Sequence, residues 1–223
     1  MTVLIDIVKD QARSENGQRA AALSAKYETM TAQEILRDAI RNEFFGDITL
    51  SSSFGADSAV LLHMVSEIDP SLPVLFLDTD RHFFQTLQYR DELKAKLGLQ
   101  NLVVLKADET EAASEDAKGT LWRTNPDACC DLRKVRPLNR IMEGGKHFKV
   151  NPLAGWTQDD LDAYFARYDL PHHPLIEQGF PSIGCFTCTK PVETGQDARS
   201  GRWAGTEKVE CGIHNPIYGG EGI

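Results

Sequence analysis

The five cysteines of this chain fall into three groups whose spacing suggests two kinds of chemistry. Cys129 and Cys130 are adjacent, Cys185 and Cys188 form a C-x-x-C pair, and Cys211 stands alone in Glu-Cys-Gly-Ile-His near the carboxyl end. Four thiolates from two close pairs can converge on a tetrahedral metal ion or an iron–sulfur cluster. The alternative is a set of unrelated thiols that are buried for packing alone. The grouping favours four ligands and one thiol that is free to react.

The composition is that of an ordinary globular chain with reduced thiols. The chain has 223 residues, of which 41% are hydrophobic and 26% charged, enough to bury a large core. Asp6 interrupts the apolar run at the amino end, and no apolar stretch approaches the roughly 18 residues of a membrane span. We therefore predict a cytoplasmic protein without a secretory signal or membrane segment. In that compartment an odd number of cysteines favours metal binding or catalysis over disulfides.

The charge pattern favours a small anion over a nucleic acid as partner. The net charge is −9, whereas binding a phosphate backbone needs a surplus of basic residues. Two basic clusters nevertheless lie near the cysteine groups, Arg133-Lys134-x-Arg136 and Arg199-x-x-Arg202. Either cluster alone could be ordinary surface charge. Their position beside the cysteines favours anion binding.

The elements that must position these residues have the pattern of an α/β protein. Helical segments extend to about residue 45, and the second begins at the capping box Thr31-Ala-Gln-Glu34. Strands then alternate with helices, which predicts an open, mostly parallel sheet with its ligand at the carboxyl ends of the strands. The predicted strands are 48–52, 73–78 and 102–105, and the helices between them lie near 59–65 and 82–97.

A turn of small residues follows the first predicted strand and has the pattern of a phosphate-binding loop. Gly55 lets the backbone approach an anion, Ser53 and Ser58 offer hydroxyls, and the next helix presents free N–H groups. Purely structural turns between strand and helix have similar compositions, so the pattern leaves both interpretations open. Asp78 and Thr79 end the second strand at the same edge, where a nucleobase or ribose could bind.

The second half of the chain carries the cysteines. A helix over 127–142 is predicted to hold the first pair, and a capped helix runs from Thr157 to about Tyr168. Adjacent helical side chains diverge by about 100°, so Cys129 and Cys130 can serve one cluster only if it lies against their helix. Beyond Pro171 we expect an irregular segment. The predicted organisation is a helical segment at 1–45, an α/β nucleotide-binding core at 46–170 and a cluster-binding, catalytic tail at 171–223.

A series of ordered motifs supports a family resemblance. The motifs are Ser-Ser-Ser-Phe-Gly-Ala-Asp-Ser from Ser51, Leu77-Asp-Thr, Cys129-Cys-x-x-Arg-Lys-x-x-Pro137-Leu, Asn151-Pro-Leu, Gly184-Cys-x-x-Cys-Thr, Gly201-Arg-Trp and Glu210-Cys-Gly-Ile-His. With them the chain resembles the assimilatory adenylyl-sulfate (APS) and phosphoadenylyl-sulfate (PAPS) reductases of the PP-loop adenine-nucleotide α-hydrolase-like group. Members with both cysteine pairs carry a 4Fe-4S cluster and typically reduce APS to sulfite and AMP for cysteine biosynthesis. PAPS reductases commonly lack the pairs.

The resemblance also implies roles for individual residues. The paired cysteines would ligate the cluster, and Cys211 would attack the substrate's sulfur to form S-sulfocysteine, from which thioredoxin or a similar dithiol releases sulfite. Cations at the site would lower the pKa of Cys211. A homo-oligomer is left open. The residues implied in substrate binding are Ser53, Gly55, Asp57, Ser58, Asp78, Thr79, Lys134, Arg199, Arg202 and His214.

Two departures from the family pattern keep alternatives open. Asp80 stands where the family usually has glycine, so a carboxylate lies beside the expected nucleotide site. Between Gly145 and Lys146 the chain lacks a segment that normally contributes a strand and an Arg-rich loop, unless Phe148-Lys-Val replaces the strand. The alternatives are therefore PAPS reduction, or a catalytically impaired nucleotide-binding iron–sulfur protein. A third is a PP-loop adenylating enzyme of sulfur transfer to RNA, which the acidic charge disfavours.

Overall fold

Parallel strands form the centre of this computed structural model, which describes residues 15–142 and 147–213. The sheet has the order β1-β2-β3, with β1 at Leu50–Ser51, β2 at Val74–Leu77 and β3 at Leu102–Leu105. Both pairings are parallel, and Leu77 lies opposite Leu105 at their carboxyl ends. The predicted open parallel α/β sheet is confirmed. Strand β1 is shorter than predicted, because pairing with β2 is limited to Leu50 and Ser51.

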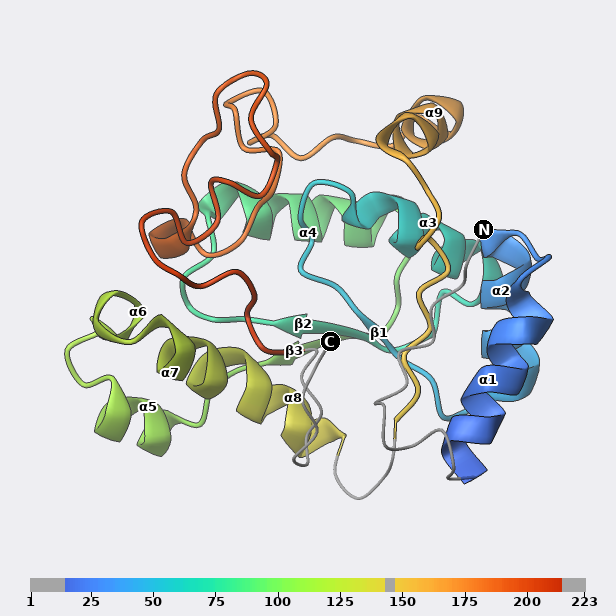
Figure 1. Cartoon of the computed structure of the whole chain (residues 1–223), viewed down its shortest axis with the longest axis horizontal. Helices are drawn as coiled ribbons and strands as arrows, with labels where there is room; N and C mark the ends of the chain where they lie inside the picture. Colours follow the sequence, from blue (N-terminus) through green and yellow to red (C-terminus); the bar gives the residue numbers. More distant parts are fainter. Residues whose placement is uncertain (1–14, 143–146, 214–223) are drawn as a thin grey trace.

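Helices cover both faces of the sheet, and the alternation of side chains along β2 explains why (Figure 1). Val74 and Phe76 enter the main core with residues of α3 and α4, whereas Leu75 and Leu77 face Leu138 of α8. Successive side chains of a strand point to opposite faces, so one buried strand supports two helical layers. The helices are α3 (Ser58–Ile68) and α4 (Phe84–Lys96) on one side, and α5 (Glu109–Glu115), α6 (Leu121–Thr124), α7 (Pro126–Cys130) and α8 (Arg136–Ile141) on the other.

The amino-terminal helices form a second, smaller core. Helix α1 (Glu15–Tyr27) packs against α2 (Ala32–Asp38), which continues into a π turn at Ala39–Glu43. The capping box predicted at Thr31 is present, since the backbone N–H of Glu34 donates to the Thr31 hydroxyl and the Thr31 backbone N–H donates to the Glu34 carboxylate.

The segment at 147–150 joins this small core instead of extending the sheet. The Phe148 ring centroid lies 5.6 Å from that of Phe44, and the Arg19 guanidinium lies 5.3 Å from the Phe148 centroid. Phe148 and Val150 pack beside Tyr27, and neither belongs to a strand. Phe148-Lys-Val therefore does not replace the strand that the family pattern contains, because Phe148 and Val150 pack against the small core instead.

The helix predicted over 127–142 is interrupted. Helix α7 ends at Cys130, a π turn covers Asp131–Val135, and α8 follows. The backbone N–H of Arg136 donates to the Asp131 carbonyl, which accommodates one extra residue in the turn. Such turns re-aim the side chains around them and are frequent at functional sites. The short helices α5 and α6 were not predicted.

The carboxyl-terminal part is largely irregular, as predicted. Helix α9 (Gln158–Tyr168) starts at a capping box made by Thr157 and Asp160, and afterwards only a 3-10 turn at Phe186–Cys188 is regular within the described residues. The segment then returns to the sheet, where Ile213 packs against Leu75, Leu77 and Leu105 (Figure 1). No described helix has the length and apolar composition needed to cross a membrane.

Candidate functional site

All four paired cysteines line one pocket between α7 and the carboxyl-terminal segment. Cys129 and Cys130 are buried on α7, Cys185 is buried at the start of the 3-10 turn, and Cys188 at its end is half-buried. Two chain segments that are distant in sequence thus bring their thiols together. The other lining residues are Thr79, Arg81, Pro126, Arg133, Lys134, Thr187, Arg202 and Trp203.

The second cysteine pair is tied to the carboxyl end of β2. The Thr79 Oγ1 atom lies 3.2 Å from the Cys185 Sγ atom, and Thr79 is buried. The backbone N–H of Phe186 donates to the Arg81 carbonyl at 2.8 Å, and His82 pairs with Cys185 in an antiparallel bridge. These contacts position a loop cysteine on a rigid strand end, which is where ligands of open α/β sheets bind.

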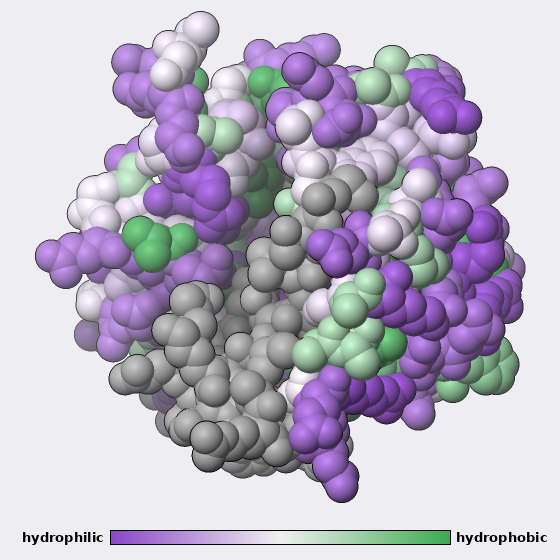
Figure 2. Space-filling view, turned by 45° about the vertical axis from the view of Figure 1, so that its right-hand side comes forward, coloured by the Kyte–Doolittle hydropathy of each residue, from purple (hydrophilic) through white to green (hydrophobic). Residues whose placement is uncertain are grey.

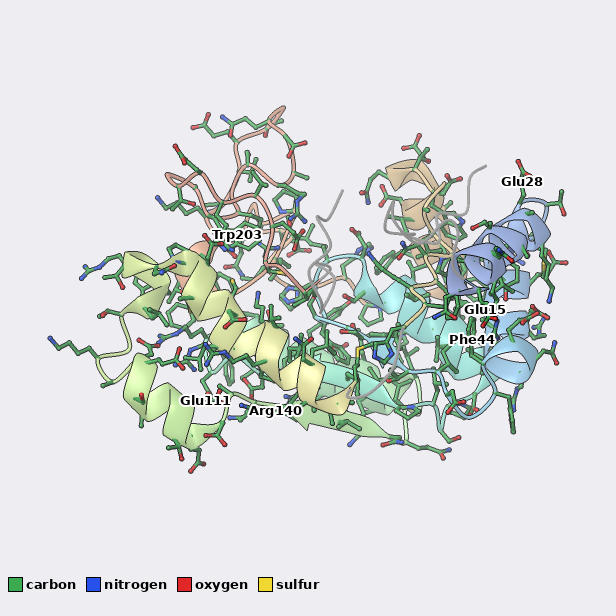
Figure 3. The ribbon with its side chains drawn as sticks, turned by 60° about the horizontal axis from the view of Figure 1, so that its bottom comes forward. Glu15, Glu28, Phe44, Glu111, Arg140 and Trp203 are labelled. Carbon is green, nitrogen blue, oxygen red and sulfur yellow. The ribbon has the colours of Figure 1, made fainter. Side chains whose placement is uncertain are left out.

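Two glycines allow the carboxyl-terminal segment to close around the pocket. A Cβ atom at Gly184 would lie 2.5 Å from Nη2 of Arg202, and one at Gly201 would lie 2.2 Å from the Lys190 carbonyl oxygen. The Lys190 carbonyl is backbone, so the position of Gly201 requires glycine, whereas a side chain at Gly184 would displace the Arg202 guanidinium from its place at the pocket. Trp203 follows at φ 48°, is buried, and donates its backbone N–H to the Cys188 carbonyl. Figure 3 shows Trp203 beside the group of helices that includes α7, which carries the first cysteine pair.

The pocket is strongly electropositive. Its described lining residues include the cations Arg81, Arg133, Lys134 and Arg202, and no carboxylate. Burial lowers the pKa of Lys134, but the neighbouring thiols of Cys185, Cys130 and Cys211 outweigh this and raise it. An anionic group would offset the mutual repulsion of these cations.

Burial disfavours the thiolate form of the first cysteine pair. Burial raises the pKa of Cys129, and the neighbouring Cys185 adds to the rise. Burial also raises the pKa of Cys130 to about 11, against the opposing charge of Lys134. Metal binding would reverse this, because a metal ligates the thiolate form.

The four thiols that line the pocket are of the kind that ligate an iron–sulfur cluster. No group of three or more Cys, His, Asp or Glu side chains in the described residues is arranged to hold one ion. Three buried Nε–H groups, those of Arg81, Arg133 and Arg202, have no hydrogen-bond partner among residues 15–142 and 147–213. A buried donor without a partner costs about 1–3 kcal/mol. A cluster with its cysteine ligands is anionic and would offer sulfur acceptors to these arginines.

Cys211 lies close enough to this pocket to interact with its cations. It is half-buried, and its backbone N–H donates to Glu210 Oε1 at 2.5 Å. Burial and a hydrogen bond to the Glu210 carboxylate raise the pKa of the thiol, while Lys134 acts in the opposite direction. The sequence predicts a lowered pKa, and this is wrong for the free protein because burial and Glu210 outweigh the cation.

The predicted phosphate-binding turn lies at the start of α3 and contacts the same carboxyl-terminal segment. Phe54 is buried with φ 49°, and Ala56 packs with Ile183, two residues before Cys185. A Cβ atom at Gly55 would lie 3.3 Å from Ser53 Oγ. Ser58 begins α3. The turn and the cysteine loop therefore form adjoining walls.

The acidic residues predicted to bind substrate have partners of their own. Burial raises the pKa of Asp57, against a hydrogen bond from Gln158. Asp78 Oδ2 lies 3.3 Å from the Lys106 Nζ atom. Asp80 adopts φ 57°, and its carboxylate lies 2.5 Å from Lys106 Nζ and 3.6 Å from Arg133 Nη1. Asp80 thus takes the left-handed conformation expected of the family's glycine, and two cations offset its charge.

The basic residues divide into two groups. Lys134 and Arg202 line the pocket, as does Thr79. Arg199 is exposed and contacts the Val209 carbonyl and Glu210. Arg136 was expected to contribute to an anion site, and this is wrong: its guanidinium is engaged by Glu111, Glu115 and Asp131. Figure 3 shows Glu111 of the same acidic group beside Arg140 of α8. His214 lies outside the described residues.

Sequence reasoning missed two residues of the site. Arg81 lines the pocket, and its place directly after the strand-end residues Asp78 to Asp80 could have drawn attention to it. Asp116 forms ion pairs with Arg81 and Arg133, and no local sequence motif distinguishes it.

Figure 2 shows that the surface between the carboxyl-terminal segment and the side with α1 and α9 is hollowed, with hydrophobic residues inside a hydrophilic rim.

Comparison with known proteins identifies the family. The model of the phosphoadenosine phosphosulfate reductase domain matches residues 47–147 and 141–191. The chain therefore belongs to the phosphoadenosine phosphosulfate reductase family. The two matched sections overlap at 141–147, around the place where the sequence predicts that a segment of the family pattern is missing.

Individual relatives agree with this assignment. The adenosine 5'-phosphosulfate reductase of Mesorhizobium japonicum is 47% identical, over 88% of this chain and 87% of its own length. That of a Chelativorans species is 44% identical, over 88% and 91% respectively. The crystal structure of the phosphoadenylyl-sulfate reductase from Candida auris, a phosphate complex, has a TM-score of 0.67 and 26% identity, and covers 76% of this chain and 95% of that one.

Proposed function

We propose that this protein reduces adenylyl sulfate to sulfite and AMP in sulfate assimilation, with a 4Fe-4S cluster on its four paired cysteines and Cys211 as the nucleophile. The observation that carries the proposal is the cation-lined pocket in which Cys129, Cys130, Cys185 and Cys188 meet, with Cys211 within the influence of the same Lys134. Relatives named adenosine 5'-phosphosulfate reductase support the substrate.

The first chemical step forms a bond between Cys211 and the substrate's sulfur. The Cys211 thiolate attacks the sulfur atom, the bond from sulfur to the bridging phosphate oxygen breaks, and AMP leaves with that electron pair. Lys134 and Arg202 would bind the sulfate oxygens and offset the repulsion between two anions. The product is an S-sulfocysteine.

A dithiol protein such as thioredoxin would complete the reduction. Its thiolate attacks the Cys211 sulfur and releases sulfite, and its second thiol then frees Cys211 while the donor becomes a disulfide. The two electrons thus come from the dithiol. An iron–sulfur cluster in the pocket would supply an anionic, sulfur-rich wall that fixes the two cysteine segments.

Binding of the nucleotide is the step of this scheme that the missing segment affects most. The turn at 53–58 and the strand ends at Asp78 and Thr79 remain for nucleotide binding, but the Arg-rich loop expected between Gly145 and Lys146 is missing from the sequence. We therefore expect a raised KM for the nucleotide with the chemistry on Cys211 retained.

The test is a comparison of sulfite release from APS and PAPS by anaerobically purified protein with thioredoxin. We expect faster sulfite release from APS than from PAPS, and no sulfite release by Cys211→Ser. We also expect four irons per chain in a cluster that depends on the paired cysteines. Faster release from PAPS would select the phosphorylated substrate. Nucleotide binding without sulfite from either substrate would identify a binding protein that has lost catalysis.

A further inference from the structure

Asp116 is a buried carboxylate that joins two arginines from different parts of the chain. Its side chain is 1% exposed, and its Oδ2 atom accepts hydrogen bonds from Arg81 Nη2 and Arg133 Nη2, each at 2.9 Å. Its Oδ1 atom accepts from the Leu121 backbone N–H at 2.9 Å. A carboxylate with three such donors is fixed in orientation.

The remaining donors of the two arginines are largely committed as well. Arg81 Nη2 also donates to the Gly119 carbonyl, and Arg133 Nη1 donates to the Thr79 carbonyl. Both side chains are nearly buried and line the cysteine pocket. The Nε–H group of each has no partner in the described residues. The planar guanidinium group is thus held by its outer nitrogens while its Nε–H remains available.

One carboxylate does not neutralise two guanidinium groups. Asp80 is the nearest other acid of Arg133, at 3.6 Å, and it is half-exposed. Burying two guanidinium groups with a single carboxylate costs free energy unless a second anion offsets the remaining positive charge. Both arginines line the cysteine pocket, so an anion there would lie beside the surplus charge.

We infer that Asp116 is a positioning residue that aims the Nε–H groups of Arg81 and Arg133 at sulfur atoms held in the pocket. The inference rests on the cluster of the proposed function. Hydrogen bonds to the sulfurs and outer-shell contacts tune metal centres and slow the loss of metal. Asp116 itself is not among the residues that line the pocket.

The test compares Asp116→Asn with Glu115→Gln in the full, anaerobically purified chain. Glu115 is the matched control because it is the neighbouring residue and accepts two hydrogen bonds from Arg136, which does not line the pocket. We expect Asp116→Asn to lose iron to a chelator on the order of tenfold faster than wild type, and to shift the Fe–S stretching bands in resonance Raman spectra. Glu115→Gln should match wild type in both.

A second variant covers the case in which Asp116→Asn does not fold. Arg81→Lys keeps the positive charge but lacks the Nε–H donor. We expect the same band shift and faster iron loss. Iron retention and spectra equal to those of Glu115→Gln in the folded variants would overturn the inference alone. A wild-type chain without iron and sulfide would overturn the proposed cofactor and the inference with it.

Discussion

The Thr79 hydroxyl, 3.2 Å from the Cys185 sulfur, links the end of β2 to the second cysteine pair. The same Oγ1 atom accepts a hydrogen bond from the Arg81 backbone N–H at 3.3 Å. Thr79 is 1% exposed, so neither group can exchange its partner for water. These contacts of Thr79 therefore fix the cysteine loop to the carboxyl end of β2.

Replacing Thr79 by valine should weaken the link between the end of β2 and the cysteine loop. Thr79→Val keeps the shape but leaves the Arg81 N–H without its acceptor, and we expect the free energy of unfolding to fall by about 1–2 kcal/mol. Iron should also be lost faster. Thr187→Val is the matched control, because the Thr187 hydroxyl lies 3.5 Å from Cys188 and is only half-buried. Urea unfolding with equal losses for both variants would contradict the role assigned to Thr79.

The reactivity of Cys211 should respond in opposite directions to its two charged neighbours. Glu210 raises the pKa of the thiol and Lys134 lowers it. At pH 7.5 or so, Glu210→Gln should therefore be alkylated several-fold faster at Cys211, and Lys134→Met several-fold slower, because the thiolate is the reactive form. Peptide mass spectrometry after timed iodoacetamide treatment measures both rates. Shifts of the same sign in the two variants would rule out this electrostatic account.

Asp80 allows the cost of its left-handed backbone to be measured. Asp80→Gly removes the contacts with Lys106 but relieves the conformation at φ 57°, so we expect a change in the free energy of unfolding within about 0.5 kcal/mol. Asp80→Ala loses the same contacts and keeps the strain, and should be about 1 kcal/mol less stable than Asp80→Gly. Chemical denaturation of both variants provides the comparison. Equal stability would show that the backbone is not strained.

A buried histidine should make the fold sensitive to acid. His173 is fully buried, contacts the Thr86 hydroxyl and accepts a hydrogen bond from the Leu175 N–H. Burial lowers its pKa to about 4. The unfolded chain binds the proton near pH 6.5, so stability should fall as the pH drops from about 6.5 to about 4, by up to about 3 kcal/mol.

The variant His173→Asn isolates this contribution. We expect lower stability at neutral pH but a smaller loss between pH 6.5 and pH 4.5 or so than in wild type. His172→Asn is the control, because His172 is exposed and stacks on Phe165 with ring centroids 4.5 Å apart. An unchanged acid dependence in His173→Asn would assign the sensitivity to other groups.

Local signals made much of the fold predictable from the sequence. Strand β3 has the predicted bounds, the capping box predicted at Thr31 is present, and the predicted capped helix begins after Thr157. Each of these features depends on neighbours within about four residues. The π turn at Asp131–Val135 interrupts the predicted helix, and helix periodicity alone did not reveal it.

The residues of the site that lie in sequence motifs were predictable. The residues whose roles depend on long-range contacts were not. The grouping of the cysteines predicted their convergence, and Lys134 and Arg202 line the same pocket. The misassigned Arg136 depends on acids of α5 that are 21 and 25 residues away. Asp116 meets Arg81 across 35 residues. Contacts of this kind follow from the fold, and a single sequence does not display them.

The most direct test of the central claim is the intact mass of the anaerobic protein after incubation with APS in the absence of a reductant. The account predicts a gain equal to one SO3 group on wild type, located at Cys211 by peptide mapping, and no gain on Cys211→Ser. An unmodified wild-type protein that still contains iron and sulfide and still binds the nucleotide would contradict nucleophilic attack by Cys211.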